Sequence, residues 1–217
     1  VRAGPGRVGP GRQPWTPSPA GGIVSGVPRI IAGREKGRRL ASPKGLLTRP
    51  TGARVRQTLF DILAPALPGC RFLDLFAGSG GIGLEALSRG AARVVLVDAD
   101  PAAAAAIREN ARALKGAGGE VQVFRQEARL CLAGLAAQGA RFDIVYLDPP
   151  YASELYEPLL EGLASAGVLA AEGVAVAEHF KKRALPETIG GLVRTRLVRV
   201  GDQHLSFYRE RAPGGAP

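Results

Sequence analysis

A short turn after an apolar stretch combines a carboxylate, two prolines and an aromatic ring. The turn is Asp148-Pro149-Pro150-Tyr151, and residues 144–147 precede it. An amino group conjugated to a purine or pyrimidine ring is a poor nucleophile, because its lone pair is delocalised. The Asp148 carboxylate and the Pro149 carbonyl can accept its two N–H bonds, while the prolines hold both acceptors rigid and Tyr151 stacks on the base. The four residues are candidate catalytic residues; a capped turn that opens the next helix is the structural alternative.

The segment from Asp74 to Gly83 has the residue types and spacing of a loop that binds a nucleoside cofactor. Glycines let the backbone turn tightly and approach a ligand beyond the carboxyl end of a strand. Asp98 lies 20 residues after Gly78, at the end of the next apolar stretch, where a carboxylate can accept ribose hydroxyls. Gly78, Gly80 and Gly83 also satisfy G-x-G-x-x-G, so a nicotinamide or flavin enzyme stays open. Asp74 disfavours a pyrophosphate and favours a ligand with an ammonium and a sulfonium, as in S-adenosylmethionine.

Alternating apolar and amphipathic stretches predict the elements that position these two groups of residues. We expect strands over 71–76, 93–98, 121–124, 142–147 and 174–178, and helices over 51–64, 81–89, 101–115, 128–138 and 153–164. Strands that alternate with helices indicate a doubly wound α/β sheet. Residues 192–200 and 204–209 flank Gly201-Asp202 and predict a closing hairpin, which places an antiparallel strand near one edge.

Composition and charge divide the chain. Residues 1–27 are rich in Gly, Pro and Arg without apolar periodicity, so we expect a disordered leader. The net charge is +10, but residues 1–56 hold 12 Lys and Arg against one acid, which leaves −1 for residues 57–217. A basic arm suits a polyanion such as nucleic acid, although a merely solvated segment is the alternative. The predicted units are the leader 1–27, a basic RNA-binding extension 28–64, a catalytic domain 65–211 and a flexible tail 212–217.

Other features exclude several classes of protein. No apolar stretch reaches the roughly 20 residues that a bilayer span requires, and the N-terminal residues lack the apolar region of a secretion signal. Cys70 and Cys131 have no metal-ligand spacing. We therefore expect a cytoplasmic protein without a membrane segment or a metal. Glu178-His179 ends a predicted core strand, where a metal or acid–base pair is conceivable and a structural or substrate-edge role is favoured.

Seven sequence strings, spread over residues 28–210, carry a resemblance to a known family. The chain resembles the RsmD-type family of bacterial 16S ribosomal RNA guanine-N2 methyltransferases. The strings are Arg29-Ile-Ile-Ala-Gly33, Gly37-Arg-Arg-Leu40, Arg49-Pro-Thr51, Arg54-Val-Arg-Gln-Thr-Leu-Phe60, Asp74-Leu-Phe-Ala-Gly-Ser-Gly80, Gly83-Leu-Glu-Ala-Leu-Ser-Arg-Gly90 and Asp148-Pro-Pro-Tyr151. The glycine loop is common to many methyltransferases, whereas the N-terminal strings are far more selective.

The resemblance implies a Rossmann-like class I methyltransferase fold, with a seven-stranded, mostly parallel sheet, a C-terminal antiparallel hairpin strand and a small basic N-terminal hairpin and helix. It implies that S-adenosylmethionine contacts Asp74, Phe76, Ala77, Gly78, Ser79, Gly80, Asp98, Ala99, Glu127, Ala128 and Asp148. It also implies that ribosomal RNA contacts Arg34, Lys36, Arg38, Arg39, Arg49, Arg54 and Arg56.

The reaction implied by the resemblance is methylation of the exocyclic N2 amino group of a guanine in 16S ribosomal RNA. The partner would be this RNA or the assembling small ribosomal subunit, and the protein would act as a monomer. The nearest alternative is a methyltransferase of an amino group in DNA or of a protein glutamine. A non-enzymatic RNA-binding module and a dehydrogenase are the alternatives from other classes.

Overall fold

Eight strands of the described chain, which include all the predicted ones, form one sheet in the order β3-β2-β1-β4-β5-β8-β7-β6. This computed structural model describes residues 28–42, 52–114, 116–150 and 154–211; the expectations for residues 1–27 and 212–217, and for Arg49 and Tyr151, lie outside these ranges. The parallel strands are β1 (Arg71–Asp74), β2 (Arg93–Val97), β3 (Glu120–Phe124), β4 (Phe142–Leu147) and β5 (Leu169–Phe180). The order reverses between β1 and β4, and a crevice beyond the strand ends at such a point is the usual ligand site of open α/β sheets.

The C-terminal hairpin extends the sheet with antiparallel strands, as the sequence predicts. β8 (Gln203–Glu210) pairs with β5, and β7 (Leu192–Val200) pairs with the other side of β8. The expected number of seven strands is wrong by one, because β6 (Thr188–Ile189) adds an eighth at the edge beside β7. Two residues are too few to produce the alternation by which a strand is recognised in a sequence.

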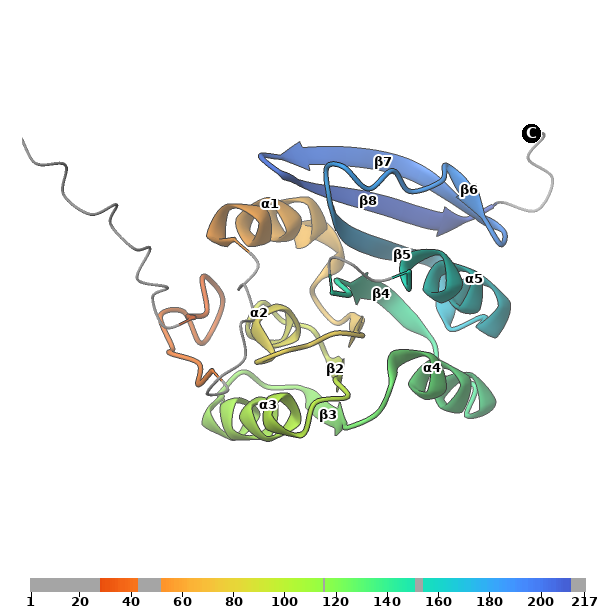
Figure 1. Cartoon of the computed structure of the whole chain (residues 1–217). Helices are drawn as coiled ribbons and strands as arrows, with labels where there is room; N and C mark the ends of the chain where they lie inside the picture. Colours follow the sequence, from red (N-terminus) through yellow and green to blue (C-terminus); the bar gives the residue numbers. More distant parts are fainter. Residues whose placement is uncertain (1–27, 43–51, 115, 151–153, 212–217) are drawn as a thin grey trace, which may run out of the picture.

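Helices cover both faces of the sheet, so that the described chain has three layers (Figure 1). The helices are α1 (Ala53–Leu63), followed by the 3-10 turn η1 (Ala64–Ala66), α2 (Gly81–Ser88), α3 (Pro101–Ala113), α4 (Ala128–Ala137) and α5 (Tyr156–Ala166). Apolar side chains of α1, α2 and α3 form one core with one face of the sheet, and those of α4 and α5 form a second core with the other face. Amphipathic helices bury their apolar stripes in this way on a twisted sheet.

Residues 28–42 form a compact hairpin against the first layer. The Ile30 N–H donates to the Arg38 carbonyl at 3.0 Å, and the Leu40 N–H donates to the Pro28 carbonyl at 2.8 Å. Ile30 and Leu40 are buried in the same core as Phe60 of α1. The segment therefore shares its hydrophobic core with the sheet and its helices.

Close packing of α2 against the sheet explains one glycine of the predicted loop. A Cβ atom at Gly83 would lie 2.5 Å from Leu96 Cδ2, which is closer than two carbon atoms can approach. Gly83 therefore lets the N-terminal turn of α2 sit directly on β2 and fixes the height of the loop above the strand ends. In the described ranges, no helix is long and apolar enough to cross a membrane.

Candidate cofactor and substrate site

The loop between β1 and α2 is held to the end of β2 by a carboxylate. Asp98 Oδ2 accepts the backbone N–H of Gly78 at 2.8 Å, and its Oδ1 accepts that of Asp100 at 2.9 Å. Gly78 and Gly80 have φ values of 55° and 85°, a region that favours glycine. The loop and Asp98 thus lie together at the carboxyl ends of β1 and β2, beside the point where the strand order reverses, and burial raises the pKa of the Asp98 carboxyl.

Asp74 is the most deeply buried acid of the loop, with 1% of its surface exposed. Its Oδ2 accepts the Gly83 backbone N–H at 3.1 Å, whereas Oδ1 accepts no well-formed hydrogen bond from the described residues. Burial raises the pKa of Asp74 to about 7, although the nearby N–H groups of Gly83 and Phe76 lower it. A buried carboxylate with an unpaired oxygen and no cationic partner fits a ligand that carries positive charge, as S-adenosylmethionine does.

The remaining predicted cofactor residues gather at the same edge of the sheet. The Gln126 N–H donates to the Asp98 carbonyl at 3.2 Å and brings the end of β3 beside the end of β2. Glu127 is exposed and precedes α4, whose first residue, Ala128, is buried; Ala99 is exposed beside Asp98. A ribose at Asp98 would place an adenine within reach of this turn, so the residues present fit the cofactor that the loop suggests.

Asp148 and Pro149 follow β4 directly, at the carboxyl end of a central strand. Leu147 pairs with Ala177 of β5, so Asp148 stands beside the next β5 residue, Glu178. Burial raises the pKa of Asp148 well above its ordinary range, and the nearby Glu178 and Asp74 carboxylates raise it further. Pro149 is buried and Pro150 is exposed. The predicted amino clamp and the predicted cofactor loop are therefore brought to one place.

Sequence reasoning missed Tyr146 and left the role of Glu178 open. The Tyr146 hydroxyl donates to Glu178 Oε2 at 2.5 Å, and the two residues are each 1% exposed. His179 points to the other face of the strand, where Nε2 lies 2.9 Å from Ser206 Oγ. An acid–base pair of Glu178 with His179 is therefore excluded, and no three His, Cys, Asp or Glu side chains in the described ranges are arranged to hold a metal.

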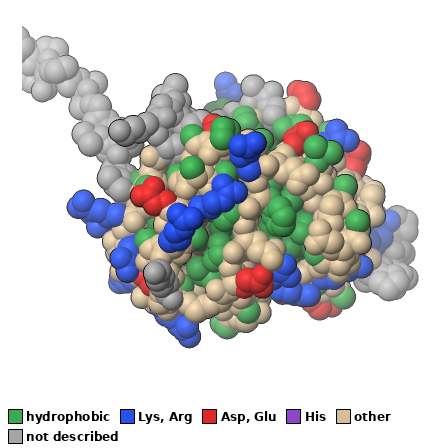
Figure 2. Space-filling model, turned by 90° about the horizontal axis from the view of Figure 1, so that it is seen from below, with side chains coloured by type: hydrophobic (Ala, Val, Ile, Leu, Met, Phe, Trp, Pro, Cys, Tyr) green, Lys and Arg blue, Asp and Glu red, His purple; other side chains and the backbone are tan. Residues whose placement is uncertain are grey.

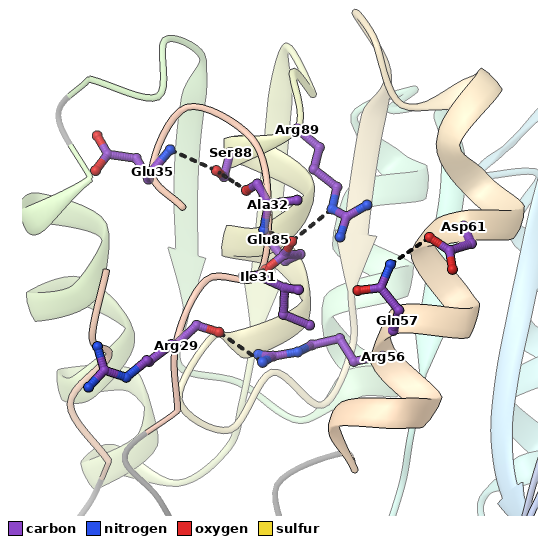
Figure 3. Close-up of polar contacts among 10 residues, drawn as sticks. All are labelled: Arg29, Ile31, Ala32, Glu35, Arg56, Gln57, Asp61, Glu85, Ser88 and Arg89. Atoms are coloured by element: carbon purple, nitrogen blue, oxygen red, sulfur yellow. Dashed lines mark hydrogen bonds and ion pairs between the residues drawn. The ribbon is translucent and has the colours of Figure 1, made fainter. Parts of the chain in front are cut away.

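The N-terminal hairpin is anchored on α2 by a second buried acid (Figure 3). The Glu85 carboxylate accepts the backbone N–H groups of Ile31 at 2.6 Å and Ala32 at 2.9 Å, and it pairs with Arg89 at 2.7 Å. Gly33 has a φ of 83°, and a Cβ atom there would lie 2.0 Å from the Ser88 carbonyl oxygen. The anchor therefore fixes the hairpin on the helix whose first turn holds the cofactor loop.

The predicted RNA-binding residues differ in whether their side chains bind other groups of the protein or are exposed. Arg56 is half-buried and donates through Nη2 to the Arg29 carbonyl at 2.8 Å (Figure 3). Arg34 donates to the Ala117 carbonyl at 3.2 Å, and Arg38 pairs with Glu35 at 3.1 Å. Lys36, Arg39 and Arg54 are exposed, and their side chains form no hydrogen bond or ion pair within the described part of the chain. Figure 2 shows blue Lys and Arg side chains on the side of the molecule where residues 28–42 and α3 lie in Figure 1.

The fold and the site together define a class I methyltransferase. A sequence family described as Conserved hypothetical protein 95 matches residues 28–209. A Bacillus subtilis protein with the name "Putative rRNA methyltransferase YlbH" is 39% identical over 84% of this chain and 99% of its own length. The Ribosomal RNA small subunit methyltransferase D of Escherichia coli is 37% identical over 88% of this chain and 93% of its own length.

A solved structure gives the same result. The Escherichia coli protein described as "Putative methyltransferase yhhF" superposes with a TM-score of 0.74 and 34% identity, over 85% of this chain and 98% of that one. The chain belongs to the RsmD-type methyltransferase family. The resemblance drawn from the sequence strings and the predicted fold class are confirmed.

Proposed function

We propose that this protein transfers a methyl group from S-adenosylmethionine to the N2 amino group of a guanine in 16S ribosomal RNA. The observation that carries the proposal is the meeting of two carboxylate sites at the carboxyl ends of neighbouring strands. Asp74 and Asp98 suit the cofactor, and Asp148 with Pro149 suits a base amino group. The relatives named as ribosomal RNA small subunit methyltransferases supply the substrate class.

The cofactor residues have distinct tasks in this proposal. When bound, S-adenosylmethionine supplies a methyl group on a positively charged sulfur. Asp74 contributes negative charge in a water-poor setting, where it acts most strongly on a cation. Asp98 accepts the ribose hydroxyls with the lone pairs that its bonds to Gly78 and Asp100 leave available. The Glu127-Ala128 turn borders the adenine.

The clamp residues prepare the amino group. The Asp148 carboxylate and the Pro149 carbonyl each accept a hydrogen bond from one of its two N–H groups. These two hydrogen bonds make the nitrogen pyramidal and direct its lone pair at the methyl group. As the new C–N bond forms, the bond from the methyl carbon to sulfur breaks, and the nitrogen becomes strongly acidic. Asp148, in its ionised form, accepts the surplus proton, and because burial and the neighbouring Glu178 and Asp74 carboxylates raise its pKa, this ionised form is a stronger base than an ordinary carboxylate.

The basic N-terminal region grips the RNA in this proposal. Lys36, Arg39 and Arg54 are exposed and available for phosphates, and Arg34 and Arg38 lie on the same hairpin. Arg49 and Tyr151, which lie outside the described ranges, keep their expected roles in RNA binding and base stacking. We propose the small-subunit RNA or its assembling particle as the partner, a monomer as the active species and the cytoplasm as its location.

The decisive experiment supplies labelled S-adenosylmethionine with protein-free 16S RNA, small-subunit particles or duplex DNA, and identifies the labelled nucleoside. The proposal requires N2-methylguanosine from RNA or particles; label in DNA alone, in a protein glutamine or in no substrate would overturn it. Asp148→Ala should reduce transfer at least about 1,000-fold while calorimetry shows retained cofactor binding. Near-normal transfer by this variant would disprove the clamp.

A further inference from the structure

Three acids lie near one another on one face of the sheet: Asp74 and Glu178 are buried, and Asp148 is half-buried. Asp148 follows β4 and stands beside Glu178 near the end of β5, whereas Asp74 ends β1 opposite Tyr146, two residues before Asp148. Tyr146, two residues before Asp148, shares its face and joins the row through Glu178. Asp74 and Asp148 have roles in the proposed function, whereas Glu178 has none.

The row contains more negative charge than the described part of the protein neutralises. No described Lys or Arg forms an ion pair with any of the three acids. Asp74 Oδ1 is buried and accepts no well-formed hydrogen bond from the described residues, so the charge of this carboxylate is only partly offset within the protein. A methyl donor with one positive charge and a base amino group account for Asp74 and Asp148. A third acceptor, at Glu178, calls for a further donor on the base.

The Glu178 side chain is held with one oxygen engaged. Oε2 accepts the Tyr146 hydroxyl, and no described residue donates a hydrogen bond to Oε1. The main-chain carbonyl of Glu178 accepts the Tyr156 hydroxyl at 2.9 Å, which fixes the strand at this position. Oε1 is therefore a positioned acceptor beside Asp148, the residue that holds the amino group.

Only one of the common bases offers a donor beside its amino group. In guanine the ring N1–H adjoins the carbon that bears the N2 amino group, so that edge presents donors in a row. In adenine and cytosine the ring nitrogen next to the amino group is an acceptor, whose lone pair would face the carboxylate. Two neighbouring carboxylates thus match the donors of the guanine edge and repel the ring acceptors of adenine and cytosine. Enzymes that bind a base flipped out of a helix recognise its edge by hydrogen bonds in the same way.

We propose that Glu178, oriented by the Tyr146 hydroxyl, accepts the N1–H of the target guanine and thereby selects guanine among the bases that carry an amino group. This inference rests on the proposed function and adds its specificity element. The bond requires an ionised Glu178. Burial raises the pKa of this carboxyl to about 7, and both the N1–H donor and the cofactor cation favour the ionised form.

The test replaces the ring donor without removing the amino group. The guanine mapped by nucleoside analysis is exchanged for 2-aminopurine in a ligated 16S RNA, because this base keeps the 2-amino group but has an acceptor at N1. The wild-type protein should prefer guanine over 2-aminopurine by at least about 100-fold in kcat/KM. With 2-aminopurine, the Glu178 carboxylate would be buried against the lone pair of N1. Equal rates on the two RNAs would overturn the proposal without any variant.

The variant Glu178→Gln sharpens the test, because its amide can donate to the N1 acceptor of 2-aminopurine. It should lower kcat/KM on guanine and raise it on 2-aminopurine, so that the preference falls at least about tenfold. A purely structural role would lower both rates together and leave the preference unchanged, which would refute the inference. Asp98→Asn is the matched control, since weaker cofactor binding should reduce both rates equally.

Two further measurements keep the outcomes separate. Cofactor binding by Glu178→Gln, measured by calorimetry, establishes that the variant is folded; if it does not fold, the wild-type comparison of the two RNAs decides alone. Tyr146→Phe should lower kcat/KM on guanine about tenfold while keeping the preference for guanine, because the carboxylate itself remains. Nucleoside analysis with the wild-type protein and native RNA comes before this test, because the absence of N2-methylguanosine there would count against the proposed function itself.

Discussion

Replacing Asp74 by asparagine should stabilise the ligand-free protein while weakening its grip on the cofactor. Burial raises the pKa of Asp74 from its ordinary 3.8 to about 7. Below pH 3.8 the carboxyl is protonated in both the folded and the unfolded chain, so its ionisation affects neither. Between pH 3.8 and 7 the unfolded chain ionises first, and stability is lost as the pH rises. This loss is complete above pH 7 and amounts to about 4 kcal/mol.

Asparagine can still accept the Gly83 N–H but never ionises. The amide NH2 group of the asparagine would take the place of Asp74 Oδ1, which accepts no hydrogen bond from the described residues. Burying this NH2 group without an acceptor costs about 1–3 kcal/mol. The net gain in the free energy of unfolding at pH 8 is therefore about 1–3 kcal/mol. The pH dependence is the sharper signature, because the difference between variant and wild type should grow by about 4 kcal/mol from pH 4 to pH 8.

Urea denaturation across this pH range, without ligand, measures the difference directly. Asp143→Asn is the control without this pH dependence. The Arg71 guanidinium lowers the pKa of Asp143 below its ordinary 3.8, so this carboxyl is ionised in the folded and the unfolded chain from pH 4 to pH 8, and the difference between this variant and wild type should stay constant over the range. S-Adenosylmethionine should then stabilise wild type more than Asp74→Asn, since the stability that a ligand adds to the folded state increases with the logarithm of its affinity. A difference between Asp74→Asn and wild type that stays constant with pH would refute the reasoning.

Three other predictions concern the anchor, the RNA surface and the pH dependence of transfer. Glu85→Ala should lower the free energy of unfolding by at least about 3 kcal/mol, because two backbone N–H groups and Arg89 lose their acceptor; urea denaturation measures the loss, and an unchanged midpoint contradicts it. Arg54→Ala should reduce the slope of RNA affinity against salt by about 1, whereas Arg56→Ala should lower thermal stability more than that slope; equal slopes would remove Arg54 from the RNA surface. The kcat/KM for transfer should decline as the pH falls below about 7, where Glu178 and Asp74 of the ligand-free protein become protonated, and a kcat/KM that stays constant down to pH 5 would exclude a role for ionised Glu178.

The order of the elements was predictable because each has its own local pattern. The limits of α2, β4 and β7 match or differ by one residue from those expected. β5 begins at Leu169, five residues earlier than predicted, because the interval before Val174 contains Gly173 and a register shift against β4. An irregular pairing of this kind interrupts the alternation that marks a strand in the sequence.

The site was predictable where a motif holds its own chemistry and unpredictable where partners come from distant parts of the chain. Asp74, Asp98 and Asp148 each end a strand, and parallel strands bring their ends together. Tyr146 and Glu178 meet only through the register of β4 and β5, 32 residues apart. Glu85 could be singled out from the sequence, since it is an acid among the apolar residues of a predicted buried helix. Its partners are backbone groups more than 50 residues away, which no side-chain pattern reveals.

The anchor of the N-terminal hairpin has a consequence for how this family can diversify. Glu85 and Ser88 of α2 bind main-chain groups of the hairpin, and of the residues between Ile31 and Glu35 only Gly33 is required by space. Main-chain groups are the same whatever side chains the hairpin carries. Side chains at its tip can therefore vary from one relative to the next without loosening the attachment. Attachment through main-chain groups is thus separate from the RNA contacts that we propose for the side chains of the hairpin.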